Sequence, residues 1–182
     1  MFLCMRSVWF LFLSPFVFGA DLTLGAILPR TSNFLENIGA AVPLAVDEIN
    51  ANTSITRGVT LDYVFSISNC DASSGISCTN NLVQQHNISA VIGPVCSEAC
   101  DTAALLLADI NVLAISPSCT AMRLSDKTTY KTFSRTVGTF RSISKALLLL
   151  FSRFKWRRAA VLFSSDTYLY SSISSLVDTD FR

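Results

Sequence analysis

Short apolar runs and amphipathic stretches alternate along the chain, and each pair predicts a strand followed by a helix. Leu22 to Leu28 is an apolar run that ends at Pro29, which is typical of a buried strand. The next stretch, residues 38–49, places its apolar side chains on one helical face: Ile38, Ala41, Val42, Ala45 and Ile49. The first unit of the chain is therefore a strand and then a helix.

The same unit repeats. Val59–Ile67 is rich in β-branched and aromatic residues, and shorter runs at Ala90–Ile92 and Val112–Ile115 also predict strands. Helices are predicted between them, at Thr79–His86 and Ser97–Ala108. Strands that alternate with helices at this spacing should pair in parallel, with right-handed crossovers covering both faces of the sheet. The predicted fold class is α/β, a doubly wound parallel sheet.

After Ser116 the alternation of apolar runs and amphipathic stretches is interrupted by a polar stretch. An extended segment is predicted at residues 133–137, a helix at 139–154 and another strand at 159–163. The helix is amphipathic, and these of its residues are expected to face inward: Ile143, Ala146, Leu147, Leu150 and Phe151. A final helix begins near Tyr168 and stops in mid-course at Arg182, so the sequence is interpreted as ending inside a βαβ unit.

The first twenty residues resemble a secretory leader more than a structural element. One charge, Arg6, precedes an apolar run from Val8 to Phe18, and the small residues Gly19 and Ala20 follow. An uncleaved anchor is the alternative, but the apolar run is shorter than the roughly 20 residues that a spanning helix needs. Residues 1–20 are therefore predicted to be a signal peptide, and the rest of the chain is expected to enter the secretory pathway.

Composition excludes two broad classes of protein. The 182 residues are 51% hydrophobic and 15% charged, with 14 Lys and Arg against 13 Asp and Glu. A disordered chain would have fewer apolar residues, and a nucleic-acid-binding protein would normally have a large basic excess. We therefore expect a folded domain with no nucleic-acid partner.

Five cysteines follow the leader, at positions 70, 78, 96, 100 and 119. An oxidising compartment favours disulfides, whereas zinc is disfavoured because no Cys-x-x-Cys pair is present and His86 is the only histidine. The odd number leaves at least one thiol unpaired or with a partner elsewhere. Acceptor triplets for N-glycosylation begin at Asn52 and Asn87 and agree with an extracellular route.

Several runs resemble one receptor family. They are Leu-Ala-Val-Asp-Glu-Ile-Asn at 44–50, Val-Ile-Gly-Pro-Val-Cys at 91–96, Tyr-Lys-Thr-Phe-Ser-Arg-Thr at 130–136 and Ala-Ala-Val-Leu-Phe-Ser at 159–164. In this order they resemble the ligand-binding region of natriuretic peptide receptors and receptor guanylyl cyclases, the ANF receptor family. The most specific element is residues 93–96, and the rest is shared with the wider periplasmic-binding-protein type I superfamily.

The resemblance implies a two-lobed, hinged domain that binds an extracellular peptide or small molecule and dimerises to pass a signal inward. The first lobe would be residues 21–137, and residues 138–182 would begin a truncated second lobe. The membrane would be reached only through a downstream segment that is missing here, so the chain is interpreted as a receptor fragment. The alternative is a soluble secreted binding or decoy protein of the same fold.

The resemblance also implies a disulfide between Cys70 and Cys96, which would stabilise the fold by about 3 kcal/mol. A second pair, Cys100 and Cys119, is expected because the first lies in the first turn of a helix and the second just past a strand, and both places meet at the carboxyl edge of a parallel sheet. Cys78 would then be free or paired outside this chain.

A ligand site is expected at the carboxyl ends of the strands, where loops and helix N-termini face a crevice. The candidate contacts are Arg30, Thr31, Ser32, Ser97, Ser116, Ser118 and Thr120. The alternative is that these hydroxyls only cap helices and turns. By resemblance to natriuretic receptors, a structural chloride would be held by Ser68 and the backbone N–H groups of Val95 and Cys96. Glu98 stands where vertebrate natriuretic receptors have an aromatic residue, so the resemblance extends to the receptor class rather than to natriuretic-peptide binding.

No catalytic motif is present in the sequence. His86 has no Gly-x-Ser-x-Gly partner, and neither a Walker loop nor a Gly-x-Gly-x-x-Gly turn occurs. A basic cluster at residues 153–158 could suggest phosphate binding, but a short basic loop is more often solvated surface. We expect no enzyme activity, no metal and no cofactor apart from the chloride.

Overall fold

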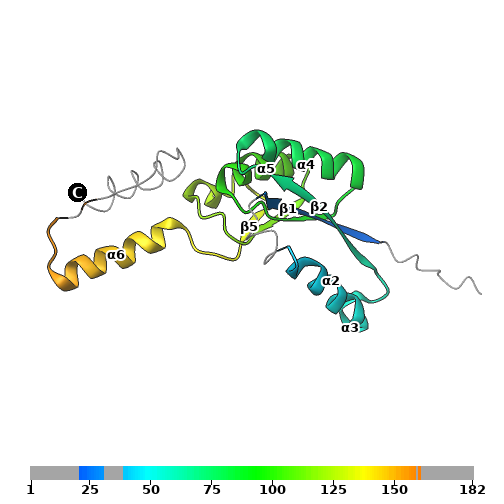
Figure 1. Ribbon diagram of the computed structural model, residues 1–182, viewed down its shortest axis with the longest axis horizontal. Helices are drawn as coiled ribbons and strands as arrows, with labels where there is room; N and C mark the ends of the chain where they lie inside the picture. Colours follow the sequence, from blue (N-terminus) through cyan, green and yellow to red (C-terminus); the bar gives the residue numbers. More distant parts are fainter. Residues whose placement is uncertain (1–20, 31–38, 159, 161–182) are drawn as a thin grey trace, which may run out of the picture.

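A five-stranded parallel sheet forms the centre of the computed structural model, which describes residues 21–30, 39–158 and 160 (Figure 1). The strands are β1 (Leu22–Pro29), β2 (Leu61–Ser68), β3 (Ala90–Ile92), β4 (Leu113–Ser116) and β5 (Phe133–Arg135). The helices are α2 (Ala41–Ala51), α3 (Thr53–Thr56), α4 (Ala72–His86), α5 (Ser97–Asp109), the 3-10 helix η1 (Met122–Ser125) and α6 (Phe140–Phe154). The predicted leader at 1–20, the strand at 159–163 apart from residue 160, and the helix from Tyr168 lie outside the described residues.

The strand order is β2-β1-β3-β4-β5, and every neighbouring pair is parallel. Strand β1 pairs with β2 along its full length, from Leu22 opposite Leu61 to Pro29 opposite Ser68. On its other side, β1 pairs with the short β3. The predicted α/β class with a parallel sheet is confirmed.

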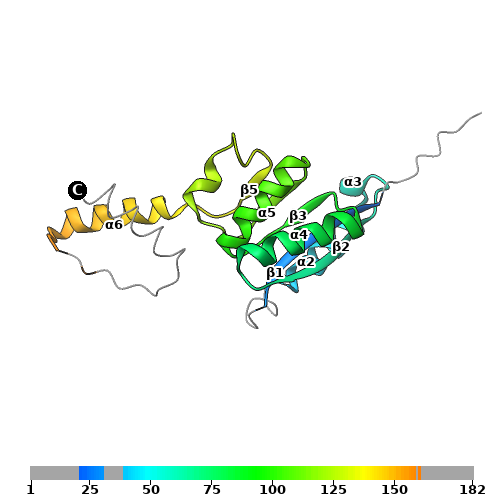
Figure 2. The same cartoon turned by 90° about the horizontal axis from the view of Figure 1, so that it is seen from above.

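Helices cover the two faces of this sheet to different extents. Figures 1 and 2 place α4 and α5 together on one face and α2 with α3 on the other. The main core lies under α4 and α5, where Ile27, Leu82 and Leu107 are fully buried. Val42 and Val46 of α2 are also buried, on the opposite side. The sheet therefore has one well-covered face and one that α2 covers only in part.

Strand β4 shows the difference between the faces residue by residue. Ala114 is buried in the core beneath α5, whereas Leu113 and Ile115 are 45% and 38% exposed. Successive strand residues point to opposite faces, so the two exposed side chains belong to the less covered face. Parallel sheets normally bury both faces, and this half of the second face has no cover among the described residues.

Helix α4 begins seven residues before its predicted start at Thr79. Its first half, Ala-Ser-Ser-Gly-Ile-Ser-Cys, has weak intrinsic helix propensity, which hid it from the sequence pattern. Asp71 caps the helix by accepting a hydrogen bond from the Ser74 backbone N–H at 2.7 Å. Gly75 permits the close packing of α4 on α5, because a Cβ there would lie 2.7 Å from the Ala99 carbonyl oxygen.

The apolar face of helix α6 is largely exposed, although the sequence pattern predicted that it faces inward. Of the residues expected inward, Ala146, Leu147 and Leu150 are exposed, Phe151 is half-buried, and the side chain of Ile143 is not described. Both views show α6 extending away from the five-stranded sheet (Figures 1 and 2). An amphipathic helix buries its apolar stripe only against another element, and the described residues supply none to α6.

In the part of the chain that is described, no helix is sufficiently long and apolar to cross a membrane.

Candidate functional site

The strand order places a topological switch point at the carboxyl ends of β1 and β3. From β1 the chain moves first to β2 on one side and then to β3 on the other. The loops that leave β1 and β3 therefore diverge, and ligands of open α/β sheets bind in the crevice that this creates. Arg30 follows β1 directly, and the Gly93-Pro94 turn follows β3.

The turn after β3 approaches β1 very closely. Gly93 has φ +99°, and a Cβ at this position would lie 2.4 Å from the Ile27 carbonyl oxygen. Its backbone N–H donates to the Ile115 carbonyl of β4 at 2.8 Å. Only glycine satisfies both the left-handed backbone conformation and the contact with β1. This single residue thus lies against β1 and is tied to β4.

Carbonyl groups of this turn accept hydrogen bonds from the segment after β4. Ser116 Oγ donates to the Pro94 carbonyl at 2.7 Å, and Ser118 Oγ donates to the Val95 carbonyl at 2.5 Å. Ser116 Oγ also accepts from the Cys119 backbone N–H at 3.0 Å. The turns that follow β3 and β4 are therefore held together by their own hydroxyl groups.

Two disulfides fasten the same region. Cys70, in the turn after β2, is bonded to Cys96, and Cys100 in the first turn of α5 is bonded to Cys119. The Cα atoms of the two pairs are 5.2 and 6.5 Å apart. These are the two pairs expected from the sequence, and Cys78 is a buried free thiol.

A buried hydroxyl group near these bridges has no protein partner. Ser68, the last residue of β2, is 1% exposed, and its Oγ makes no hydrogen bond within the described residues. The Cys70–Cys96 bridge brings the start of α5 close to the turn that follows Ser68. Neither Val95 nor Cys96 donates its backbone N–H to another described backbone group. An orphaned hydroxyl and free N–H groups at a helix N-terminus fit a small anion.

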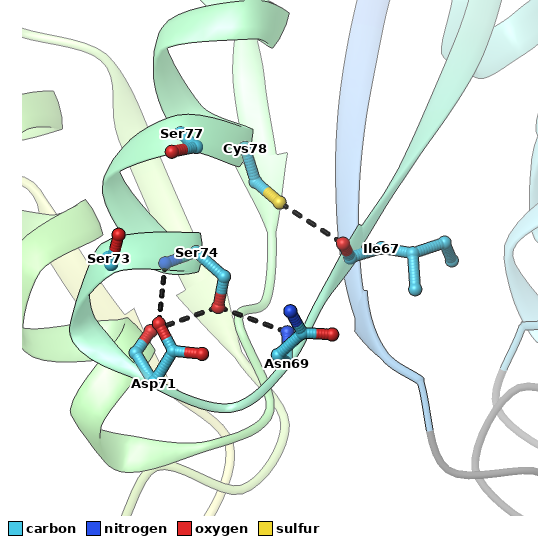
Figure 3. A pocket seen from close by; sticks show the side chains of 7 residues that line it. All are labelled: Ile67, Asn69, Asp71, Ser73, Ser74, Ser77 and Cys78. Atoms are coloured by element: carbon cyan, nitrogen blue, oxygen red, sulfur yellow. Dashed lines mark hydrogen bonds between the residues drawn. The ribbon is translucent and has the colours of Figure 1, made fainter.

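A polar pocket of about 500 Å³ lies beside this edge, between the end of β2 and the first two turns of α4 (Figure 3). Its lining residues are Ile67, Asn69, Asp71, Ser73, Ser74, Ser77 and Cys78. The Ser74 hydroxyl already makes two hydrogen bonds within the protein: its Oγ accepts from the Asn69 backbone N–H at 3.0 Å and donates to the Asp71 carbonyl at 3.1 Å. Cys78 Sγ lies 3.4 Å from the Ile67 carbonyl oxygen.

A buried tyrosine ties α5 to the segment before β5. The Tyr130 hydroxyl donates to Asp101 Oδ1 at 2.5 Å, and Arg123 Nε lies 2.7 Å from the same oxygen. Burial, together with the hydrogen bond to Asp101 and the charge of that residue, raises the pKa of Tyr130 to about 12. The unfolded phenol ionises near pH 10, so this contribution to stability is complete below pH 10 and is lost as the pH rises towards 12.

No group of three or more His, Cys, Asp or Glu side chains suited to a metal ion occurs within the described ranges. Arg135 has a structural position: its Nη1 donates to the Cys119 and Ala121 carbonyls at 3.0 and 2.8 Å. Among the described residues, the carboxyl edge offers hydrogen-bond donors and acceptors.

Comparison with known proteins agrees with this geometry. A family model described as the receptor family ligand binding region matches residues 37–182, more than half of the chain. The chain belongs to this receptor family. It is a periplasmic-binding-protein-like α/β domain, and we refer to it below as the receptor domain.

Relatives of the receptor domain include both cyclases and other receptors. Guanylate cyclase 32E of Drosophila melanogaster is 27% identical over 139 residues, 75% of this chain and 12% of the relative. Gamma-aminobutyric acid type B receptor subunit 2 of Rattus norvegicus is 31% identical over 134 residues, 73% of this chain and 14% of the relative. Taste receptor type 1 member 1 of Homo sapiens is 29% identical over 153 residues, 75% of this chain and 18% of the relative. The chain thus spans less than a fifth of the length of these relatives.

The candidate ligand residues fall into four groups. Ser97, Ser118 and Thr120 are half-buried at the carboxyl edge, beside the turns after β3 and β4. Ser116 is fully buried and all its hydrogen bonds are internal, so it shapes the turn. Arg30 is exposed and donates from Nε to Asn69 Oδ1 at 3.0 Å. Thr31 and Ser32 lie outside the described residues.

Sequence reasoning missed the pocket between β2 and α4. Its serines belong to the half of α4 whose helical character was not recognised. A signal was available in the spacing of Asp71 and Ser74. Asp71 is a residue type that often caps a helix, and it binds the backbone N–H three positions later. Ser73 and Ser77 also line this pocket, and neither has a hydrogen-bonding role among the described contacts.

We predict that Gly93→Ala destabilises the receptor domain by about 3 kcal/mol, the combined effect of a left-handed backbone and a steric clash with Ile27. Gly58→Ala is the matched control, because Gly58 also has positive φ (+88°) but no atom within 4 Å of its added Cβ. The control should cost only about 1 kcal/mol. Urea unfolding measures both values, and equal losses would show that the contact with β1 is unimportant.

Proposed function

We propose that the receptor domain is the extracellular ligand-binding region of a membrane receptor of the receptor guanylyl cyclase type. The observation that carries this proposal is the convergence of the turns after β3 and β4 beside the switch point between β1 and β3, in a chain of a ligand-binding family. In this proposal residues 1–20 direct the chain into the secretory pathway, and a downstream segment holds the receptor in the membrane. The domain itself carries out no catalysis.

The ligand is a small molecule or peptide held by hydrogen bonds at the carboxyl edge. In this proposal Ser97 and Thr120 supply them, and Ser118 contributes only as an acceptor because its hydroxyl donates to the Val95 carbonyl. Arg30 adds a positive charge at the end of β1. Glu98 lies in the first turn of α5 and adds a negative charge beside Ser97. One relative is named for gamma-aminobutyric acid and the names of the guanylate cyclases state no ligand, so both amino-acid and peptide ligands belong in the test.

Signalling requires a second copy in this proposal. Two receptor domains associate as a homodimer, and ligand binding changes their arrangement. The names of the relatives support the receptor class, which includes guanylate cyclases and a gamma-aminobutyric acid receptor subunit.

Thermal unfolding of the secreted protein tests the site. Probes are γ-aminobutyric acid, L-glutamate and an atrial natriuretic peptide, each added over a concentration series. A probe that binds the folded state should raise the melting temperature, because ligand at 100 times its Kd adds about 2.7 kcal/mol of stability. The increase should shrink in Ser97→Ala and Thr120→Ala.

Ser73→Ala is the matched control, a serine on the polar pocket between β2 and α4. A probe whose effect survives both edge variants and is lost in Ser73→Ala would place the binding site in that pocket. That outcome would contradict the proposed function of the switch-point edge.

We also propose that a chloride ion is held at the end of β2, by Ser68 Oγ and the backbone N–H groups of Val95 and Cys96. The support is the buried Ser68 hydroxyl without a partner and the bridge that brings Cys96 close to it. Chloride would satisfy these donors and stabilise the junction between β2 and α5.

The chloride proposal predicts a higher melting temperature in sodium chloride than in sodium gluconate at equal ionic strength. Ser68→Ala should remove most of this difference, because it deletes the side-chain donor. Ser66→Ala is the control, a half-buried serine on the same strand and the same face. Equal melting temperatures of the unaltered protein in the two salts would rule out the ion.

A further inference from the structure

The two Asn-x-Ser triplets lie far apart in sequence but share one edge of the sheet. Asn52 ends α2 and is the N-cap of α3, just before β2. Its neighbour Asn50 fixes this position by two hydrogen bonds to Leu61, the first residue of β2: Nδ2 to the carbonyl at 2.8 Å and Oδ1 to the backbone N–H at 2.9 Å. Asn52 is therefore at the amino edge of the sheet.

Asn87 reaches the same edge from the other side of β1. It is the C-cap of α4 and has a left-handed backbone with φ +46°, which asparagine adopts more readily than most residues. The Ser89 backbone N–H donates to the Thr23 carbonyl near the start of β1 at 2.8 Å, and Ile88 is buried. The side chains of Asn87 and Ser89 are exposed on either side of this anchor.

Both acceptor side chains are available for modification. Asn52 and Ser54 are exposed, and Asn52 Oδ1 accepts from the Ser54 backbone N–H at 3.1 Å and from Ser54 Oγ at 2.6 Å. These bonds occupy the oxygen and leave the amide nitrogen, Nδ2, without a partner among the described residues. Asn87 Nδ2 likewise makes no hydrogen bond to a described group. A large, hydrated substituent on either nitrogen displaces no packed atom.

We propose that Asn52 and Asn87 both carry N-linked oligosaccharides, so that the amino edge of the sheet is a glycan-bearing face. The inference rests on the proposed passage through the secretory pathway. In the transfer, Nδ2 forms a bond to the anomeric carbon of a lipid-pyrophosphate-linked oligosaccharide. The bond from that carbon to the pyrophosphate breaks, the lipid pyrophosphate leaves, and the amide nitrogen loses one proton.

The position of the two glycans fits the position of the ligand site. Parallel strands have all their carboxyl ends at one edge and all their amino ends at the other. Glycans on Asn52 and Asn87 therefore leave the turns after β3 and β4 uncovered. They also keep the amino edge in solvent, because bulky glycans there oppose close packing of another protein.

Translation of the full chain with microsomes tests the proposal. Chains that are protected from added protease should show two discrete mobility steps, which peptide-N-glycosidase F removes. Ser54→Ala and Ser89→Ala should each abolish one step, and the double variant should abolish both. These substitutions destroy the acceptor triplets but retain the Asn52 cap and the Asn87 turn, so the fold is preserved. Ser54→Thr and Ser89→Thr are the matched controls and should keep both steps.

A second version, with residues 1–20 replaced by an established cleavable leader, separates the two proposals. Mobility steps with the established leader, but no protected chain with the natural one, would support the glycan sites and contradict the proposed secretory route. Protected chains without mobility steps, or steps that persist in the double variant, would overturn the glycan proposal while leaving the secretory route intact.

Discussion

The start of α5 is covalently fastened on both sides, and the carboxyl edge of the sheet depends on this constraint. Cys96, at the N-cap, is bonded to the turn after β2, and Cys100, one turn later, is bonded to the turn after β4. The neighbouring strands β3, β4 and β5 have only three, four and three residues, so their backbone ladders are short. Each disulfide contributes about 3 kcal/mol by limiting the unfolded chain, which is a large share of the stability of a small domain.

Hydrogen bonds join the same turns that the disulfides connect. The Gly93-Pro94 turn touches β1, bonds to β4 and accepts the Ser116 hydroxyl, and Arg135 of β5 holds the carbonyl of Cys119. A set of turns held this rigidly can present hydroxyl groups in a fixed arrangement, which lowers the entropic cost of ligand binding. At the opposite edge, the exposed side chains of Asn52 and Asn87 are compatible with large flexible substituents.

The sequence predicted the elements whose signal is local. Strand β3 was predicted with its observed limits because a short apolar run is followed by Gly93-Pro94. The Cys100–Cys119 pair followed from where parallel strands end, whereas the Cys70–Cys96 pair was implied by the resemblance to the receptor family. The first half of α4 was missed because a Ser- and Gly-rich segment has weak helix propensity, and packing of Gly75 on α5 stabilises it instead. The exposed stripe of α6 and the pocket at Asn69 and Asp71 depend on which elements lie nearby, and periodicity contains no such information.

Peptide mapping of the secreted protein without reduction tests the central claim most directly. After alkylation of the denatured protein and proteolysis, the account predicts two linked peptide pairs, Cys70 with Cys96 and Cys100 with Cys119. Cys78 should carry the alkyl label. A peptide that links Cys70 to Cys78 would contradict the account, because α5 would then no longer be joined to the turn after β2.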